Sequence, residues 1–146
     1  MNGAANPALL LGASLSALAA ALHLAIIVGG APWYRFFGAG EGMARLAQAG
    51  HWWPALLTLG IAFVLLVAAA YALGAGGWSA ALRGLPGLRW VLLGITAVYL
   101  LRGLAPWLAM LLQPELRQPF WIWSTLICAG YGGVHALGLA QVWSRL

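Results

Sequence analysis

The chain contains no lysine and no aspartate, and its only acidic residues are Glu41 and Glu115. Charged residues occupy 6% of its 146 positions, whereas about a quarter of the residues in a soluble globular domain are charged. Hydrophobic residues make up 64% of the chain. This scarcity of charge excludes an ordinary soluble fold and indicates a protein that lies mostly within a membrane.

Cysteine is equally scarce. Cys128 is the one cysteine and lies in an apolar run, which excludes a disulfide framework and a cysteine-based metal site. All seven basic residues are arginines and give a net charge of +5. They amount to a small positive excess and not to a basic surface that could grip nucleic acid, so we expect no nucleic-acid partner.

What the sequence has instead is four long apolar runs, near residues 8–28, 53–73, 90–112 and 120–142. Each reaches the roughly 20 residues that a helix needs to cross a bilayer core of about 30 Å. The first run is expected to be a span and not a cleaved signal peptide, because it is too long and no basic residue precedes Pro7. We expect residues 1–146 to form a single domain, an all-α integral membrane protein with four transmembrane helices in an antiparallel bundle.

Four crossings place both termini and the loop of residues 74–89 on one side, opposite the loops of residues 29–51 and 113–119. Each side carries three arginines, so the positive-inside rule decides little. The free amino terminus favours cytoplasmic termini, and the compact, Arg-, Ala- and Gly-rich chain favours a bacterial inner membrane. The orientation we expect is therefore a multi-pass inner-membrane protein with both termini in the cytoplasm.

The second half of the loop of residues 29–51 has a helical pattern. A short helix near residues 42–49 has one apolar face, and Gly50 is suited to end it. Glu41 and Arg45 are four residues apart, the spacing of a helical ion pair. Because the segment before this helix is aromatic, we expect the short helix to lie in the membrane interface.

The third apolar run carries a charge near its centre, in "AVYLLRGLAPWLAMLL" (residues 97–112). Placing Arg102 there costs about 3 kcal/mol on insertion scales, so something must offset it. Pro106 lacks the N–H that would bond the carbonyl of Arg102, and Tyr99 lies on the same helical face. The pattern indicates either a structural charge bonded within the protein or a binding group near the bilayer midplane.

The histidines lie at different depths. At a rise of about 1.5 Å per residue, His23 lies roughly 6 Å from the centre of the first run, and His135 lies about as far from the centre of the fourth run in the opposite direction. His51 lies at the mouth of the second run, near Glu41. With Arg102 between them, these residues predict a polar file across the membrane. The alternative is that the histidines are hydrogen-bond partners between helices.

The fourth run repeats polar and small residues at steps of four and three, which is one helical stripe: Ser124, Cys128, Tyr131, His135 and Gly138. Its glycines are expected to be close-packing positions: Gly130, Gly132, Gly133 and Gly138. The candidate substrate-binding residues are the polar side chains of the file and their neighbours: Arg102, His23, His135, Tyr99, Arg35, Glu41, His51 and Tyr131.

Motifs for catalysis and cofactors are mostly missing. The sequence has no phosphate-binding glycine loop and no CxxC, and its two carboxylates are far apart in sequence. Haem would need two histidines at similar depth, but His23 and His135 differ by about 12 Å. No two ligands share a helix face at the spacing of a metal site. We therefore expect no metal and no haem or other cofactor, and enzyme activity is not favoured.

Three functions remain open. The first is binding or translocation of a small or amphiphilic substrate, anionic or lipid-like, through a pocket lined by Arg35, His23, Tyr99 and Arg102. The second is an accessory or assembly subunit of a larger membrane complex, and the third is a small membrane enzyme or redox protein that uses His and Arg residues. The partners expected are membrane lipids, with a homo-oligomer or a larger complex compatible with the first two functions.

Overall fold

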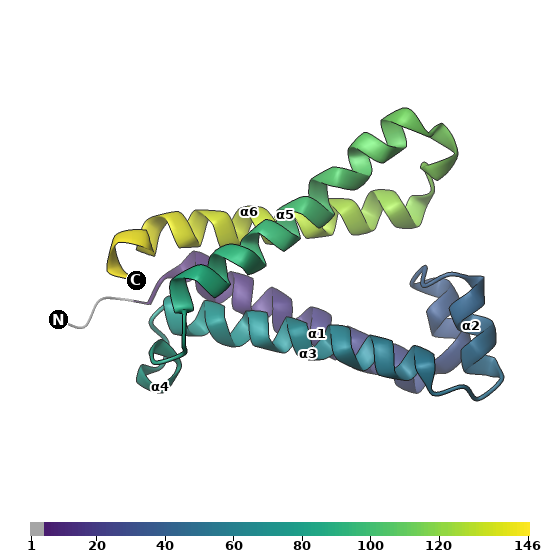
Figure 1. Cartoon of the computed structure of the whole chain (residues 1–146), viewed down its shortest axis with the longest axis horizontal. Coiled ribbons are helices and arrows are strands. Elements are labelled where there is room, and N and C mark those ends of the chain that lie inside the picture. Colours follow the sequence, from purple (N-terminus) through teal and green to yellow (C-terminus); the bar gives the residue numbers. More distant parts are fainter. Residues whose placement is uncertain (1–4) are drawn as a thin grey trace. The chain divides into compact units, whose positions relative to one another are not determined.

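A computed structural model describes residues 5–146, and these residues are helical with no strand. The elements follow in the order α1 (Pro7–Phe36), α2 (Glu41–Gln48), α3 (Trp53–Ala75), α4 (Ala80–Arg83), α5 (Leu88–Leu112), the 3-10 turn η1 (Pro114–Leu116), α6 (Pro119–Val142) and the 3-10 turn η2 (Trp143–Arg145). Figure 1 shows the helices and their connections. The all-α class is confirmed. The amino-terminal amine used in the orientation argument lies outside the described residues.

Four of these helices, α1, α3, α5 and α6, are long and apolar enough to cross a membrane, as predicted. Only 22% to 28% of the most apolar window of each helix is buried within the protein. Side chains such as Val28 (89% exposed) and Leu112 (73% exposed) would be unfavourable in water. Apolar helices with apolar outer surfaces belong in a bilayer, so the chain is a multi-pass membrane protein.

Helix α1 continues past the predicted span of residues 8–28 but is not straight. At Gly30 the backbone leaves helical geometry, with φ 63° and ψ −151°. A positive φ suits glycine, and Pro32 lacks the N–H needed to continue the helical hydrogen bonds. Residues 31–36 then form a further helical segment, where the sequence predicted an aromatic segment of the loop.

The chain divides into two compact units. The first contains the residues up to 15 together with Ala68–Leu146, and the second contains Ser16–Val67.

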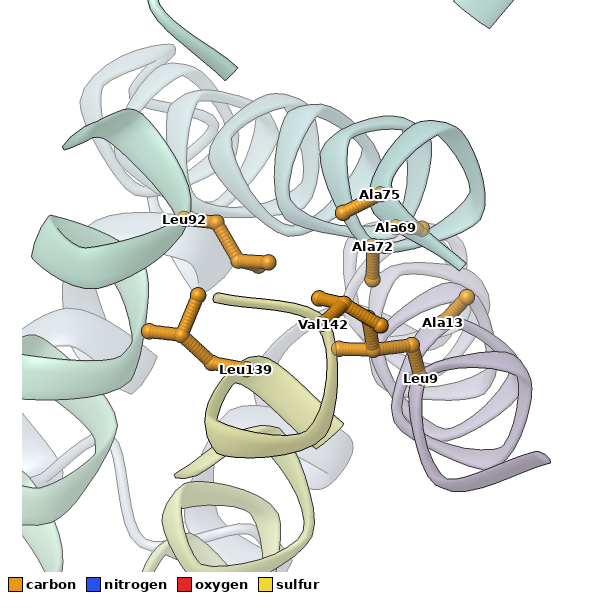
Figure 2. Packing of buried hydrophobic residues seen from close by; sticks show 8 residues of the cluster. All are labelled: Leu9, Ala13, Ala69, Ala72, Ala75, Leu92, Leu139 and Val142. Atoms are coloured by element: carbon orange, nitrogen blue, oxygen red, sulfur yellow. The ribbon is translucent and has the colours of Figure 1, made fainter. Parts of the chain in front are cut away.

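The core of the first unit joins four helices. Leu9 and Ala13 of α1, three alanines of α3, Leu92 of α5, and Leu139 and Val142 of α6 are all buried and pack together (Figure 2). The alanines of α3 recur at intervals of three, at positions 69, 72 and 75. Small side chains let helix backbones approach closely, which is how helices associate in membranes.

Asn6 joins three helices of this unit. Its Oδ1 accepts a hydrogen bond from the N–H of Leu9 (2.9 Å), which caps the start of α1 ahead of Pro7. Its backbone N–H donates to the carbonyl of Gly76 (2.8 Å), and its Nδ2 donates to Oε1 of Gln141 (2.7 Å). The backbone and the side chain of one buried residue therefore anchor α1 to the end of α3 and the end of α6.

The second unit packs the segment after the kink against α3 and α2. The hydroxyl of Thr58 donates to the carbonyl of Pro54 (2.8 Å), so it accepts the hydrogen bond from the hydroxyl of Tyr34 (3.1 Å). Tyr34 also packs with Ile26 and with Ala44 of α2. Helix α2 lies within one residue of its predicted bounds. Gly50 follows it with φ 74°, as expected of a helix stop.

Candidate functional site

Helices α5 and α6 form an antiparallel pair, because contacts later in α5 are made earlier in α6 (Figure 1). The approach is closest at Gly103, which faces the backbone of Ala129, and at Gly132, which faces Leu100. Of the glycines expected to be packing positions, Gly132 and Gly138 pack closely. Gly130 and Gly133 do not pack closely against any other described part of the chain, because open space lies where a Cβ would be.

Arg102 lies near the middle of α5 and is half-buried. Its Nη2 donates to Oγ of Ser124 (3.1 Å), whose own hydroxyl donates to the carbonyl of Trp121 (3.3 Å). The guanidinium carbon lies 5.2 Å from the centroid of the Trp121 ring, within the range of a cation–π contact. The charge is therefore partly offset by α6.

One nitrogen of the Arg102 guanidinium has no hydrogen-bond acceptor among the residues that the structure describes. Nη1 of Arg102 is buried and has no hydrogen-bond partner anywhere in residues 5–146. A buried donor of a charged group left without an acceptor costs free energy. The site is therefore an incompletely satisfied cation near the centre of a membrane helix.

A cavity of about 270 Å³ lies one helical turn further along α5. Its lining is almost entirely apolar: Ala105, Pro106, Ala109, Met110, Leu116 and Trp121. Pro106 interrupts the hydrogen bonding of α5 at this point. Nε of Arg117 donates to the carbonyl of Met110, one of the lining residues (2.9 Å). Trp121 belongs to both places, because its ring lines the cavity and contacts Arg102.

A second polar cluster lies on the same helix pair. The ring of Tyr99 (8% exposed) lies 5.6 Å from that of Tyr131 and 5.0 Å from the imidazole of His135, centroid to centroid. His135 is fully buried, and Gly12 of α1 faces it so closely that an added Cβ would meet the imidazole at 2.8 Å. In the predicted stripe on α6, Tyr131 and His135 therefore meet Tyr99 of α5, whereas Gly138 faces Leu9 of α1.

The hydrogen bond of His135 shows which nitrogen of its imidazole carries a proton. Nδ1 lies 2.8 Å from the carbonyl of Tyr131, which can only accept, so Nδ1 carries the proton. In the neutral imidazole, Nε2 is then an acceptor. Within the described part of the chain this buried Nε2 has no partner. His23 makes the same bond from Nδ1 to the carbonyl of Ala19 (2.7 Å).

Arg35 and Glu41 lie together in the second unit. Nε and Nη2 of Arg35 donate to the two carboxylate oxygens of Glu41 (3.0 and 3.1 Å), and Nη2 also donates to Oε1 of Gln48. Nε of Arg45 lies 3.4 Å from Glu41, at the predicted helical spacing. The hydrogen bond from Arg35 lowers the pKa of the Glu41 carboxyl below its ordinary value, and the nearby positive charges add to this effect.

The eight candidate residues therefore fall into two sets. Tyr99, Arg102, Tyr131 and His135 lie in the first unit, and His23, Arg35, Glu41 and His51 lie in the second. The first set follows the α5–α6 pair. In the second set only Arg35 and Glu41 bond to each other, while His51 is exposed.

Three important residues were missed from the sequence. Neither Trp121 nor Tyr34 was singled out there. Their roles depend on contacts across helices, which no spacing within one helix reveals. Asn6 was missed too, although an asparagine followed by proline at the start of an apolar run is a helix-start signal.

Comparison with protein-family models, curated proteins and solved structures finds no match to this chain. Among residues 5–146, no group of three or more His, Cys, Asp or Glu side chains is placed to hold a metal ion.

Proposed function

We propose that this membrane protein binds an amphiphile with an anionic head group on the α5–α6 pair. Arg102 holds the head group, and the apolar cavity beside Trp121 holds the chain. The observation that carries the proposal is the buried Nη1 of Arg102, which lacks a hydrogen-bond acceptor next to an apolar cavity. A carboxylate or phosphate oxygen supplies the missing acceptor, and a charge-assisted bond is the stronger kind.

The volume of the cavity limits the size of the ligand that can fit. A volume of about 270 Å³ lies just below the usual range of about 300–1,000 Å³ for small-molecule sites. It therefore suits one apolar chain better than two. Because the lining of the cavity is almost wholly apolar, affinity for the chain comes from burial, and selectivity for the head group comes from Arg102.

The proposed function also includes translocation of the substrate along one face of α6. From Ser124 the stripe on α6 continues through Cys128 and Tyr131 to His135, whose Nε2 offers a free acceptor. Buried ionisable groups in membrane helices are typical of substrate and proton pathways. We propose that a transported head group or proton moves along this stripe.

The membrane arrangement is part of the proposal. The four spans form an antiparallel bundle, α2 lies in the interface, and both termini face the cytoplasm of a bacterial cell. The partly buried face of α2, around Ala44, and its exposed Glu41 and Arg45 suit a helix at a membrane surface.

Binding of dodecanoate, compared with uncharged dodecanol, tests the proposal in neutral detergent. Wild-type protein is expected to prefer dodecanoate, and Arg102→Gln to bind it about tenfold more weakly or worse, the loss expected for one charge-assisted hydrogen bond. Arg45→Gln, which removes an exposed charge outside the site, is the matched control. Arg102→Lys retains the charge, and its affinity for dodecanoate is expected to lie between those of the wild type and Arg102→Gln. If Arg102→Gln binds dodecanoate as the wild type does, the proposal is wrong.

A second candidate, a subunit of a larger membrane complex or a homo-oligomer, has one specific observation in its favour. Gly130 and Gly133 lie on an exposed face of α6 with open space around them. Small residues on an outer helix face allow another helix to approach. Cross-linking in native membranes distinguishes a subunit of a larger complex from a homo-oligomer. Cross-links to a single abundant different protein, which disappear in the Gly133→Leu variant, support a subunit. Cross-links only between copies of this chain support an oligomer.

A further inference from the structure

A second cavity lies in the first unit, at the start of α5. It has a volume of about 480 Å³, and three of its lining residues are arginines: Arg83 of α4, Arg89 of α5 and Arg145 of η2. Leu146, which follows Arg145, also lines the cavity. The remaining lining residues come from the segment between α4 and α5 and from the first turn of α5. Three residues far apart in the sequence thus place positive charge around one space.

No acidic side chain balances this charge. Glu115 lies in η1, beyond the opposite end of α5, and 24 residues of rise separate the ends of that helix by about 36 Å. Glu41 belongs to the second unit, where it is bonded to Arg35. Even with a free carboxylate at Leu146, three arginines leave an excess of two positive charges at the cavity.

Arg89 is held in place by aromatic rings. Its guanidinium carbon lies 4.0 Å from the centroid of the Trp143 ring and 5.9 Å from that of Trp90, and the two rings meet edge to face. Its Nε is buried, and the described residues offer it no hydrogen-bond acceptor. Stacking fixes the planar guanidinium and leaves donors for an anion.

The other two arginines are only loosely engaged. Nη2 of Arg83 donates to the carbonyl of Gly77 (2.9 Å), and Nη2 of Arg145 donates to the carbonyl of Gln141 (3.2 Å). Each guanidinium has five N–H donors, so both retain donors for a ligand. Both side chains are exposed, so they can adjust to one without disturbing the core.

The backbone adds to the same potential. Gly87 precedes α5, and no side chain caps the start of this helix. The N–H groups of Trp90 and Val91 both bond to the carbonyl of Gly87, while the earlier N–H groups of the first turn have no partner within the helix. The positive end of the helix dipole therefore points to the arginine-lined cavity.

We propose that this cavity is a binding site for a phosphate group, with Arg83, Arg89 and Arg145 as its ligands. Bidentate guanidinium groups and a helix start are the groups that proteins use for phosphate. A membrane lipid is one source of the phosphate, because Trp90 and Trp143 are residues typical of the headgroup level and basic pockets at the membrane surface bind anionic lipids. A soluble phosphate ester is the other source. The site is independent of Arg102.

The test measures lipid binding to the purified full chain in neutral detergent by native mass spectrometry. Phosphatidylglycerol is the anionic probe, phosphatidylcholine is the zwitterionic control, and inorganic phosphate is titrated separately by thermal shift. Wild-type protein is expected to retain phosphatidylglycerol over phosphatidylcholine. The double variant Arg83→Gln/Arg145→Gln is expected to bind it about tenfold more weakly, with an unchanged helical content because both side chains are exposed. Arg45→Gln, which removes an exposed charge outside both proposed sites, is the control, and it is charge-matched to the single variants Arg83→Gln and Arg145→Gln.

The outcomes separate the sources. Loss of phosphatidylglycerol binding in the double variant but not in Arg45→Gln supports a lipid headgroup site. Stabilisation by inorganic phosphate that is lost in the same variant supports a soluble phosphate. Equal retention of the two lipids together with no response to phosphate, or retention unchanged by the double variant, overturns the proposal. Arg89→Lys adds a second variant, because it keeps the charge and removes the planar stack on Trp143.

Discussion

At the scale of single residues, several polar side chains in the long helices form hydrogen bonds to the backbone of their own helix. Ser14, Thr58 and Thr96 each donate to the carbonyl four residues earlier, and His23 and His135 make the same kind of bond. This arrangement hides a polar group from lipid without a partner on another helix. Arg102 is different, because its guanidinium bonds to a neighbouring helix.

Substitution of Asn6 is expected to lower the stability of the first unit. Asn6→Ala removes the cap of α1 and the bond to Gln141, and we expect a loss of at least about 1 kcal/mol in the free energy of unfolding. Thermal denaturation in detergent measures it. Ser14→Ala, which removes one bond inside α1, is the control. Equal effects of the two substitutions would contradict the role given to Asn6.

The Glu41 carboxylate is expected to make the contacts between Arg35 and α2 sensitive to acid. Its pKa is lowered in the folded protein, so its contribution to stability is present above the ordinary pKa of glutamate, about 4.3, and is lost as the pH falls through the lowered value. We expect the protection of α2 amides from hydrogen exchange, corrected for the intrinsic exchange rate at each pH, to fall under acid conditions in wild-type protein. In Glu41→Gln the corrected protection should already be lower at neutral pH and should lose this pH dependence. A wild-type profile that is unchanged in Glu41→Gln would refute the assignment.

At the scale of elements, the pairing of α5 with α6 depends on missing side chains. Gly103 faces Ala129 and Gly132 faces Leu100, so the backbones approach where no Cβ intervenes. This close approach positions Arg102 against Ser124 and Tyr99 against His135. The candidate site is therefore a consequence of packing between these two helices.

Two alanine substitutions in α5 test this pairing. Gly103→Ala places a Cβ against the backbone of Ala129 and is expected to cost about 1–3 kcal/mol of stability through overpacking. Gly94→Ala, on the same helix, meets open space and should leave stability unchanged or slightly raised. The melting temperatures of the two variants in one detergent provide the comparison. A Gly103→Ala variant as stable as Gly94→Ala would show that the close approach is not needed.

At the scale of the whole molecule, four apolar helices with exposed apolar surfaces require a bilayer. An even number of spans places both ends of the chain on one side. A topology reporter fused after Leu146 or inserted at residues 76–79 is expected to report that side, and one inserted at residues 37–40 should report the opposite side. Reporters at residues 37–40 and after Leu146 that agree would contradict four crossings.

Part of the candidate site could be predicted from the sequence. The position of Arg102, its shared face with Tyr99, the stripe on α6 and the Glu41–Arg45 pair all follow from spacing within one helix, where geometry is regular. The partners of Arg35 and the stacking of Arg89 on Trp143 could not be predicted. They join segments far apart in sequence, and such contacts depend on how helices rotate and on where they cross.

The sequence by itself determined that this is an all-helical membrane protein with four spans, because hydropathy over about 20 residues is a local property that no packing changes. Tertiary structure decided which polar groups meet. It paired Arg102 with Ser124 and Trp121 and left Nη1 without an acceptor, and it gathered three arginines around the start of α5. The physical reason is that small residues such as Gly103 determine which helix faces touch, and the facing side chains then determine the chemistry.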